Sequence, residues 1–232
     1  MKILETTAST VTMEDYRREK VILKTIDGHD IAALYYHVAE PKGGVVFVHM
    51  MPATKESWDD IAKRFEQEGL TSIAIDLRGH GESRGGPQGY QRFTDEEHQK
   101  SILDVDAAVK FLFSKGILPE QLSLIGASIG ANLALKYIAD HHDIGMAVLL
   151  SAGLNYRGVI AEQNIKELSS GQRIFLVSAE DDDENAEENK ELYASLPEGV
   201  EHKIKIFPHA GHGTTMLENQ PGLVEEILDF IE

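Results

Sequence analysis

The chain has 232 residues, 42% of them hydrophobic, and a formal net charge of −17 at pH 7. This length and apolar content suit one globular α/β domain, so we expect residues 1–232 to form a single domain, with residues 1–18 as an N-terminal extension. The charge argues against nucleic acid or anionic lipid as a partner and, mildly, against strongly anionic substrates, because few cations are available to neutralise phosphates. The lack of cysteine excludes disulfides, thiolate metal sites and a cysteine nucleophile.

The N-terminal sequence lacks the continuous apolar stretch and the small-residue cleavage site of a secretory signal. No later run is apolar and long enough to cross a bilayer. We therefore expect a cytoplasmic protein without a membrane partner. The oligomeric state stays open between a monomer and a homodimer, since an edge strand could pair between chains.

The predicted elements alternate between strands and helices along the whole chain. Segments 21–25 and 31–37 flank the turn signal Asp27-Gly28 and predict an antiparallel hairpin. Further strands are expected at 45–49, 71–75, 122–125, 146–150, 174–178 and 203–207. Helical spacing is found at 58–65, from a capping box at Thr94 and Glu97 to 112, at 129–138 and at 223–230. This alternation predicts an α/β fold with a mostly parallel eight-stranded sheet flanked by helices. Only about twenty residues connect the strands ending near 151 and starting near 173, too few for a large lid domain.

The motif Gly126-Ala-Ser-Ile-Gly130 follows an apolar strand and opens a helix. Such a strand–turn–helix with a G-x-S-x-G sequence is the nucleophile elbow of serine hydrolases. A tight turn lets the Ser128 hydroxyl project from the backbone, and the N–H of Ile129 would donate one hydrogen bond to an oxyanion. The alternative is a helix N-cap serine. The strand before the motif and the helix after it favour the elbow.

A serine nucleophile needs a base, which we expect in the loop after the last strand. His212 lies there between two glycines, and His209 is the nearby rival. A carboxylate that orients the histidine is expected after the strand at 174–178. Spacing alone does not choose among the candidate carboxylates Glu180, Asp181, Asp182 and Asp183.

The second oxyanion donor is expected from the loop after the strand at 45–49, as the backbone N–H of Met50 or Met51, with Met51 preferred. Met50, Trp58 and Tyr156 are candidates for the pocket wall. Each of these side chains suits an ordinary apolar core equally well.

These motifs together resemble the α/β-hydrolase superfamily, in its group of small bacterial esterases and dienelactone-hydrolase-like proteins. The resemblance rests on Val45-Val-Phe-Val-His-Met50, on Ala74-Ile-Asp-Leu-Arg-Gly-His-Gly-Glu-Ser83, on the elbow and on Ala210-Gly-His-Gly213. It implies Asp182 as the acid of a Ser128–Asp182–His212 triad, counting three residues on from Ala179. It also implies structural roles for Asp76, Arg78 and His80. Met50 replaces the family's usual glycine, and the nucleophile is serine where dienelactone hydrolases have cysteine.

The expected function is hydrolysis of small, uncharged carboxylic esters through an acyl-enzyme intermediate, with no metal or cofactor and with a small-molecule ester as the substrate. One alternative is a lipid-directed hydrolase such as a lysophospholipase or monoacylglycerol lipase. A second alternative is a non-catalytic binding protein on the same fold.

Overall fold

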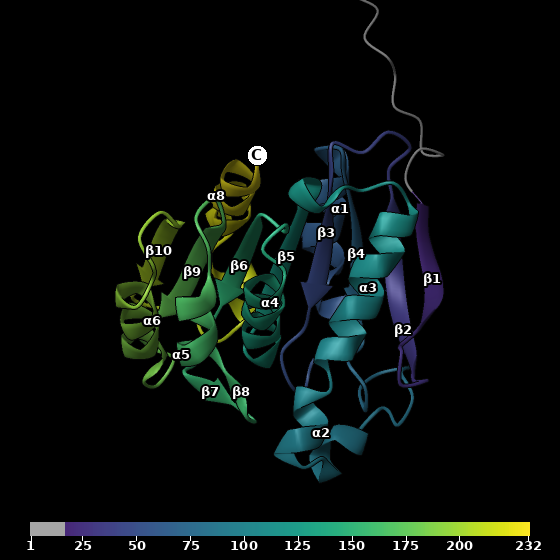
Figure 1. Cartoon of the computed structure of the whole chain (residues 1–232), viewed down its shortest axis with the longest axis horizontal. Coiled ribbons are helices and arrows are strands. Elements are labelled where there is room, and N and C mark those ends of the chain that lie inside the picture. The colour runs from purple at the N-terminus through teal and green to yellow at the C-terminus, as the bar shows by residue number, and fades with distance from the viewer. Residues whose placement is uncertain (1–16) are drawn as a thin grey trace, which may run out of the picture.

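The computed structural model describes residues 17–232, and its centre is an eight-stranded sheet in the order β1-β2-β4-β3-β5-β6-β9-β10 (Figure 1). β1 pairs antiparallel with β2 and β2 antiparallel with β4, while every other neighbouring pair is parallel. The predicted sheet and N-terminal hairpin are therefore confirmed. The strands are β1 (Arg17–Lys24), β2 (Asp30–His37), β3 (Gly43–Val48), β4 (Leu70–Ile75), β5 (Leu122–Ala127), β6 (Met146–Leu150), β9 (Arg173–Ala179) and β10 (Glu201–Phe207).

The predicted N-terminal extension lies mostly outside the described residues. Arg17 and Arg18 already belong to β1, where they pair with the end of β2, so the ordered sheet begins before residue 18. The sequence pattern did not reveal this start because charged residues on an edge strand interrupt the apolar alternation.

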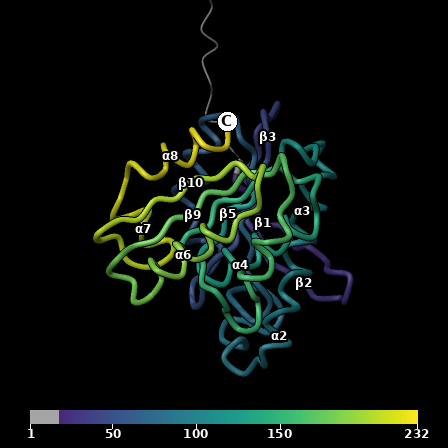
Figure 2. The backbone as a smooth tube through the Cα atoms, turned by 60° about the vertical axis from the view of Figure 1, so that its left-hand side comes forward, coloured from purple at the N-terminus to yellow at the C-terminus, as the bar shows by residue number. Residues whose placement is uncertain are grey.

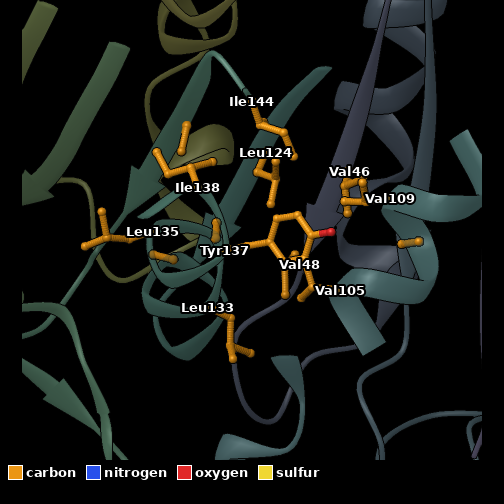
Figure 3. Close-up of a cluster of buried hydrophobic side chains, with 14 of the residues drawn as sticks. Val46, Val48, Val105, Val109, Leu124, Leu133, Leu135, Tyr137, Ile138 and Ile144 are labelled. Atoms are coloured by element: carbon orange, nitrogen blue, oxygen red, sulfur yellow. The ribbon is translucent and has the colours of Figure 1, made fainter. Parts of the chain in front are cut away.

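Helices cover both faces of the sheet (Figure 2). α3, α4, α5 and α6 contribute to the apolar cluster on one face, whereas α1, α7 and α8 contribute to the cluster on the other. Figure 3 shows side chains from β3, β5, α3 and α4 meeting in the first cluster. The helices are α1 (Asp59–Gln67), α2 (Asp95–Gln99), α3 (Ile102–Ser114), α4 (Ile129–Asp140), α5 (Ala161–Asn164), α6 (Asn185–Ala194), α7 (Thr215–Asn219) and α8 (Gly222–Ile231), and the short 3₁₀ helices are η1 (Lys55–Trp58), η2 (Gly89–Arg92), η3 (Pro119–Gln121) and η4 (Ile165–Glu167). No helix among residues 17–232 has both the length and the apolarity needed to cross a membrane.

The helix expected from Thr94 to residue 112 is two helices. The capping box of Thr94 and Glu97 is present and starts α2, which ends at Gln99, and α3 begins at Ile102. The two helices bury different surfaces, because α2 turns His98 toward Phe93 while α3 packs on β3 and β4. A single straight helix could not make both contacts.

The connection between β6 and β9 contains no large lid, as predicted, but it does contain structure. A two-stranded hairpin of β7 (Asn155–Tyr156) and β8 (Val159–Ile160) precedes α5. The hairpin and α2 lie at the same end of the molecule, beyond the sheet (Figure 1). Strands of two residues leave too short a pattern to be found from sequence periodicity.

Two buried ion-pair networks hold the loop that follows β4. Asp76 accepts a hydrogen bond from the backbone N–H of Lys55 at 2.8 Å and lies 2.7 Å from its Nζ. Arg78 Nη2 lies 2.8 Å from Asp104 Oδ1 on α3, and Arg78 Nη1 lies 2.8 Å from Asp27 Oδ2 in the first hairpin. Asp76 and Arg78 therefore have the structural roles expected of them.

His80 belongs to a stack of rings in the same loop. Its ring lies nearly parallel to Tyr90, with centroids 4.0 Å apart, and edge-on to His49 at 4.9 Å. Burial is the main cause that lowers the pKa of His80 to about 4, so this imidazole is neutral at pH 7. Because His49 directly follows β3, the stack fixes Tyr90 near the carboxyl edge of the sheet.

We predict that Asp104→Asn lowers the free energy of unfolding by about 3 kcal/mol, because the buried Arg78 guanidinium loses one of its two compensating charges. Urea unfolding at pH 7 measures this change. Asp60→Asn is the control, since Asp60 is fully exposed and water screens its ion pair with Lys63, so this change should leave stability almost unaltered. Equal effects of the two substitutions would contradict a structural role for the Arg78 network.

Candidate active site

Ser128 occupies a sharp turn between β5 and α4. It has φ 54° and ψ −121°, a left-handed conformation that a serine rarely adopts without compensation. The flanking glycines explain how the turn fits. A Cβ atom on Gly126 would lie 2.1 Å from the carbonyl oxygen of Gly130, and one on Gly130 would lie 2.2 Å from that of Val48. Only hydrogen atoms at both positions allow α4 to approach β5 and β3 this closely.

Ile129 is the first residue of α4, so its backbone N–H has no partner within the helix. The N–H groups at this helix end carry partial positive charge that favours an anion. Met51 follows β3, which is the parallel neighbour of β5. The two predicted oxyanion donors therefore come from adjacent strand ends.

His212 and Asp182 are in direct contact. Nδ1 of His212 lies 2.9 Å from Oδ1 and 2.8 Å from Oδ2 of Asp182, and the two side chains are 37% and 11% exposed. The histidine loop also packs on the elbow, because a Cβ on Gly213 would lie 3.4 Å from the Cβ of Ala127. The structure thus brings the loop of His212 to the turn that carries Ser128.

The structure separates the two adjacent aspartates that spacing left open. Asp181 Oδ1 accepts hydrogen bonds from the backbone N–H groups of Ala210 at 3.0 Å and Gly211 at 3.1 Å. These two bonds are the main cause that lowers the pKa of Asp181. Asp181 therefore shapes the histidine loop, while Asp182 contacts the imidazole. His209, the rival histidine, is 87% exposed and lies 3.7 Å from Asp181.

Ser151 is a site residue that the sequence analysis missed. Its hydroxyl donates a hydrogen bond to Asp182 Oδ2 at 2.9 Å and accepts one from the backbone N–H of Gly213 at 2.9 Å. It thereby links the acid to the histidine loop. Ser151 directly follows β6 and has φ 54°. Its place after a buried strand, at the same sheet edge as Ser128, was the available signal.

The predicted pocket residues lie in different environments. Trp58 is 0% exposed and stacks on Phe47 with ring centroids 5.0 Å apart, so its prediction as a pocket residue is wrong and it belongs to the core. Its large indole ring buries apolar surface within this core cluster. Met50 is half-buried, with its sulfur 4.0 Å from the Thr214 hydroxyl, and Met51 lines a cavity described below.

Tyr156 lies close to both the candidate nucleophile and the candidate base. Its ring is edge-on to His212 with centroids 6.5 Å apart, and its hydroxyl accepts a hydrogen bond from Asn185 Nδ2 at 3.4 Å. Burial, followed by the charges of Glu188 and Asp182, raises the pKa of Tyr156 to about 12, against a smaller lowering by its contact with the Ser128 hydroxyl. The phenol is therefore neutral at pH 7 and touches the Ser128 side chain.

Two hollows are lined by candidate site residues, and the charges of their linings differ. One has a volume of about 760 Å³ and is lined by Tyr156, His212 and a set of acidic residues, namely Asp182, Asp183, Glu184 and Glu188. The other, of about 380 Å³, is lined by Met51, Pro52, Tyr90, Gln91, Phe93, His98 and Arg157. Within residues 17–232, no group of three His, Asp or Glu side chains is arranged to hold a metal ion.

Comparison with known proteins places this site in a family. The family model described as serine aminopeptidase, S33 (Hydrolase_4) matches residues 39–170, more than half of the chain. The chain therefore belongs to this family of α/β hydrolases. The matched region includes Ser128, whereas Asp182 and His212 lie beyond its end.

Solved structures share the fold along almost the full chain. An esterase of Pyrococcus furiosus superposes with a TM-score of 0.76 at 19% identity, covering 96% of this chain and 95% of that one. A dienelactone hydrolase from Anabaena variabilis gives 0.74 at 16% identity, covering 93% and 94%. The predicted α/β-hydrolase fold is confirmed.

Among curated proteins, a polyketide transferase of Stachybotrys chlorohalonatus is 31% identical over 120 residues, 51% of this chain and 39% of that protein. A non-heme chloroperoxidase of Kitasatospora aureofaciens is 30% identical over 134 residues, 56% of this chain and 43% of that protein. The matched part spans less than half the length of each relative. Because these relatives are named for different reactions, the reaction of this chain has to be inferred from the residues of its site.

We predict that Ser151→Ala lowers the free energy of unfolding by about 1–3 kcal/mol, because the buried N–H of Gly213 loses its partner. Chemical denaturation measures this. Ser178→Ala is a matched control: Ser178 is equally buried, but its hydroxyl has no hydrogen-bond partner among residues 17–232, so the change should be neutral or stabilising. A Ser151→Ala protein as stable as Ser178→Ala would show that the link between Asp182 and Gly213 contributes nothing.

Proposed function

We propose that the protein is a serine hydrolase that cleaves small carboxylic esters through an acyl-enzyme intermediate. The contact of His212 with Asp182, on a loop packed against the turn of Ser128, is the observation that carries the proposal. An imidazole held by a carboxylate through Nδ1 keeps Nε2 free to accept a proton. The esterase-like fold supports the same reaction class.

In the first step, Nε2 of His212 accepts the proton of Ser128 as Oγ forms a bond to the ester carbonyl carbon. The oxyanion accepts hydrogen bonds from the N–H groups of Ile129 and Met51. When the intermediate collapses, the bond to the alkoxy oxygen breaks and His212 gives its proton to the leaving alcohol. Water then attacks the acyl-enzyme as His212 accepts its proton, which returns to Ser128 when the carboxylic acid leaves. Asp182 stabilises the imidazolium in both steps.

The substrate is a small molecule. One open hollow is lined by His212 and Asp182 and a second by Met51. The −17 net charge argues against nucleic acid or anionic lipid as the partner. The half-exposed His212 fits a site that such a substrate reaches without displacing a domain.

We predict that Ser128→Ala lowers kcat for 4-nitrophenyl acetate by about a thousandfold or more, because the nucleophile is removed. Steady-state kinetics and labelling by a fluorophosphonate probe measure this. Ser123→Ala, on the strand β5 that precedes Ser128, should keep activity within about twofold. Retained turnover by Ser128→Ala would refute the nucleophile, and a folded wild-type protein that stays unlabelled and inactive would favour a non-catalytic binding protein.

We predict that His212→Ala and Asp182→Asn each lower kcat by about a thousandfold or more, since the first removes the base and the second its orienting charge. His209→Ala and Asp181→Asn are matched controls. His209 is exposed, and the amide oxygen that replaces a carboxylate oxygen in Asp181→Asn can still accept the two backbone hydrogen bonds of the loop, so both variants should keep most of the activity. Losses as large in the controls as in the test variants would contradict the proposed triad.

A further inference from the structure

Arg157 occupies a backbone position that arginine rarely takes. Arg157 and Gly158 form the two-residue turn between β7 and β8, with φ values of 52° and 79°. A turn with both central residues at positive φ normally has Asn, Asp or Gly in the first position, because a Cβ there is strained. Strain of this kind persists only where the surrounding structure maintains it, and it is concentrated at functional sites.

The surrounding structure does fix this turn. The N–H of Gly158 donates a hydrogen bond to the Asn155 side chain at 2.9 Å. A Cβ on Gly158 would lie 2.2 Å from Nε2 of Gln99, so the tip of the hairpin is pressed against α2. The position of Arg157 is therefore set by a tertiary contact.

The guanidinium of Arg157 is available for a ligand. Among residues 17–232 it has no carboxylate within 4.0 Å, although Asp95 on α2 lies beside the turn. Arg78, by contrast, is paired with Asp104, and Arg64 with Glu225. A chain with an excess of 17 negative charges thus leaves this cation unpaired at the rim of a cavity.

The 380 Å³ cavity beside Arg157 has an aromatic wall and a second polar group. Tyr90, fixed by its stack on His80, and Phe93 supply flat apolar surface. His98 is 3% exposed and lines the same cavity, and neither of its ring nitrogens is hydrogen-bonded within residues 17–232. Burial, followed by the charge of Arg157, lowers the pKa of His98, so its ring is a neutral donor or acceptor at pH 7.

The cavity adjoins groups of the candidate active site. Met51, the proposed oxyanion donor, lines one side of it, and Tyr156, which touches the Ser128 hydroxyl, directly precedes Arg157. An acyl group bound to Ser128 could therefore extend into this cavity. The other hollow, with four carboxylates, would repel an anion.

We propose that this cavity is an acyl subsite for a planar, aromatic group whose far end carries a carboxylate, which Arg157 binds. The inference rests on the proposed ester hydrolysis and narrows its substrate class from small carboxylic esters to monoanionic ones, in place of the uncharged esters expected from the sequence. The aromatic ring packs against Tyr90 and Phe93, and the guanidinium fork donates two hydrogen bonds to the carboxylate. Within the cavity the overall negative charge of the protein is countered, because the lining contains Arg157 and no carboxylate.

The test compares two esters of equal shape, methyl 4-carboxybenzoate and methyl 4-carbamoylbenzoate, which differ in the charge of the far group. We expect wild-type kcat/KM to favour the carboxylate by about tenfold or more, as one partly desolvated ion pair allows. Arg157→Gln should abolish this preference and leave kcat/KM for the neutral ester within about twofold. Arg92→Gln is the matched control, since Arg92 lies on the neighbouring segment but does not line the cavity, and it should keep the preference.

Thermal unfolding provides a readout that is independent of turnover. Arg157→Asn should raise Tm by about 2 °C or more while abolishing the carboxylate preference, because asparagine tolerates the positive φ that strains arginine. A variant that gains stability but loses selectivity for the carboxylate supports a ligand-binding role for Arg157. A fall in Tm with the preference intact would mean that Arg157 is structural and would overturn the proposal.

Calorimetric titration of the Ser128→Ala protein with methyl 4-carboxybenzoate separates this proposal from the proposed function. If the double variant Ser128→Ala/Arg157→Gln binds this ester about tenfold more weakly than Ser128→Ala, the subsite is supported. This holds even if the wild type hydrolyses neither ester, and in that case only the proposed function fails. Hydrolysis of both esters at equal rates, with equal binding by the two variants, overturns the subsite and leaves the proposed function standing.

Discussion

The site depends on how closely α4 approaches the sheet at residues 126–130. Two glycines allow backbone atoms to meet where any Cβ would collide, once with Gly130 and once with the end of β3. This contact forces Ser128 into a left-handed conformation and points the start of α4 toward the same sheet edge. Because β3, β5, β6 and β9 are parallel neighbours, the loops that carry Met51, Ser151 and Asp182 begin at that edge too. One close contact therefore sets the frame in which every other candidate group is positioned.

The parts of the molecule that follow local rules could be predicted from the sequence. Continuous apolar segments indicated the buried parallel strands, because such strands are covered on both faces. The glycine-flanked serine indicated the elbow, and Thr94 with Glu97 indicated the start of α2, because both depend on residues within a few positions. The preference for His212 over His209 agrees with the contacts seen, since glycines on both sides allow the loop to turn the ring inward.

The remaining features depend on contacts between distant segments. Asp181 and Asp182 have the same chemistry and adjacent positions, and only the direction of the turn after β9 separates a loop-shaping carboxylate from one that contacts His212. The hydrogen-bond partners of Ser151 are Asp182 and Gly213, which are 31 and 62 positions further along the chain. Trp58 is core because Phe47 lies on the strand beneath it. No periodicity or spacing rule carries such information, because each outcome is decided by the packing of the folded chain.

The tip of the β7–β8 hairpin, seated on α2, has a consequence for how this enzyme class diversifies. Most of the wall of the smaller cavity comes from two excursions, that is, two segments outside the eight-stranded sheet. Residues 88–98 supply Tyr90, Gln91, Phe93 and His98, and residues 155–160 supply Arg157. Neither excursion supplies a member of the proposed triad. Loops of this kind can be exchanged while the scaffold is kept. In the proposed subsite, most residues that would contact the acyl group therefore lie on segments separate from the triad. We expect that transplanting both segments together into a related scaffold would transfer a binding preference, whereas moving either one alone would not.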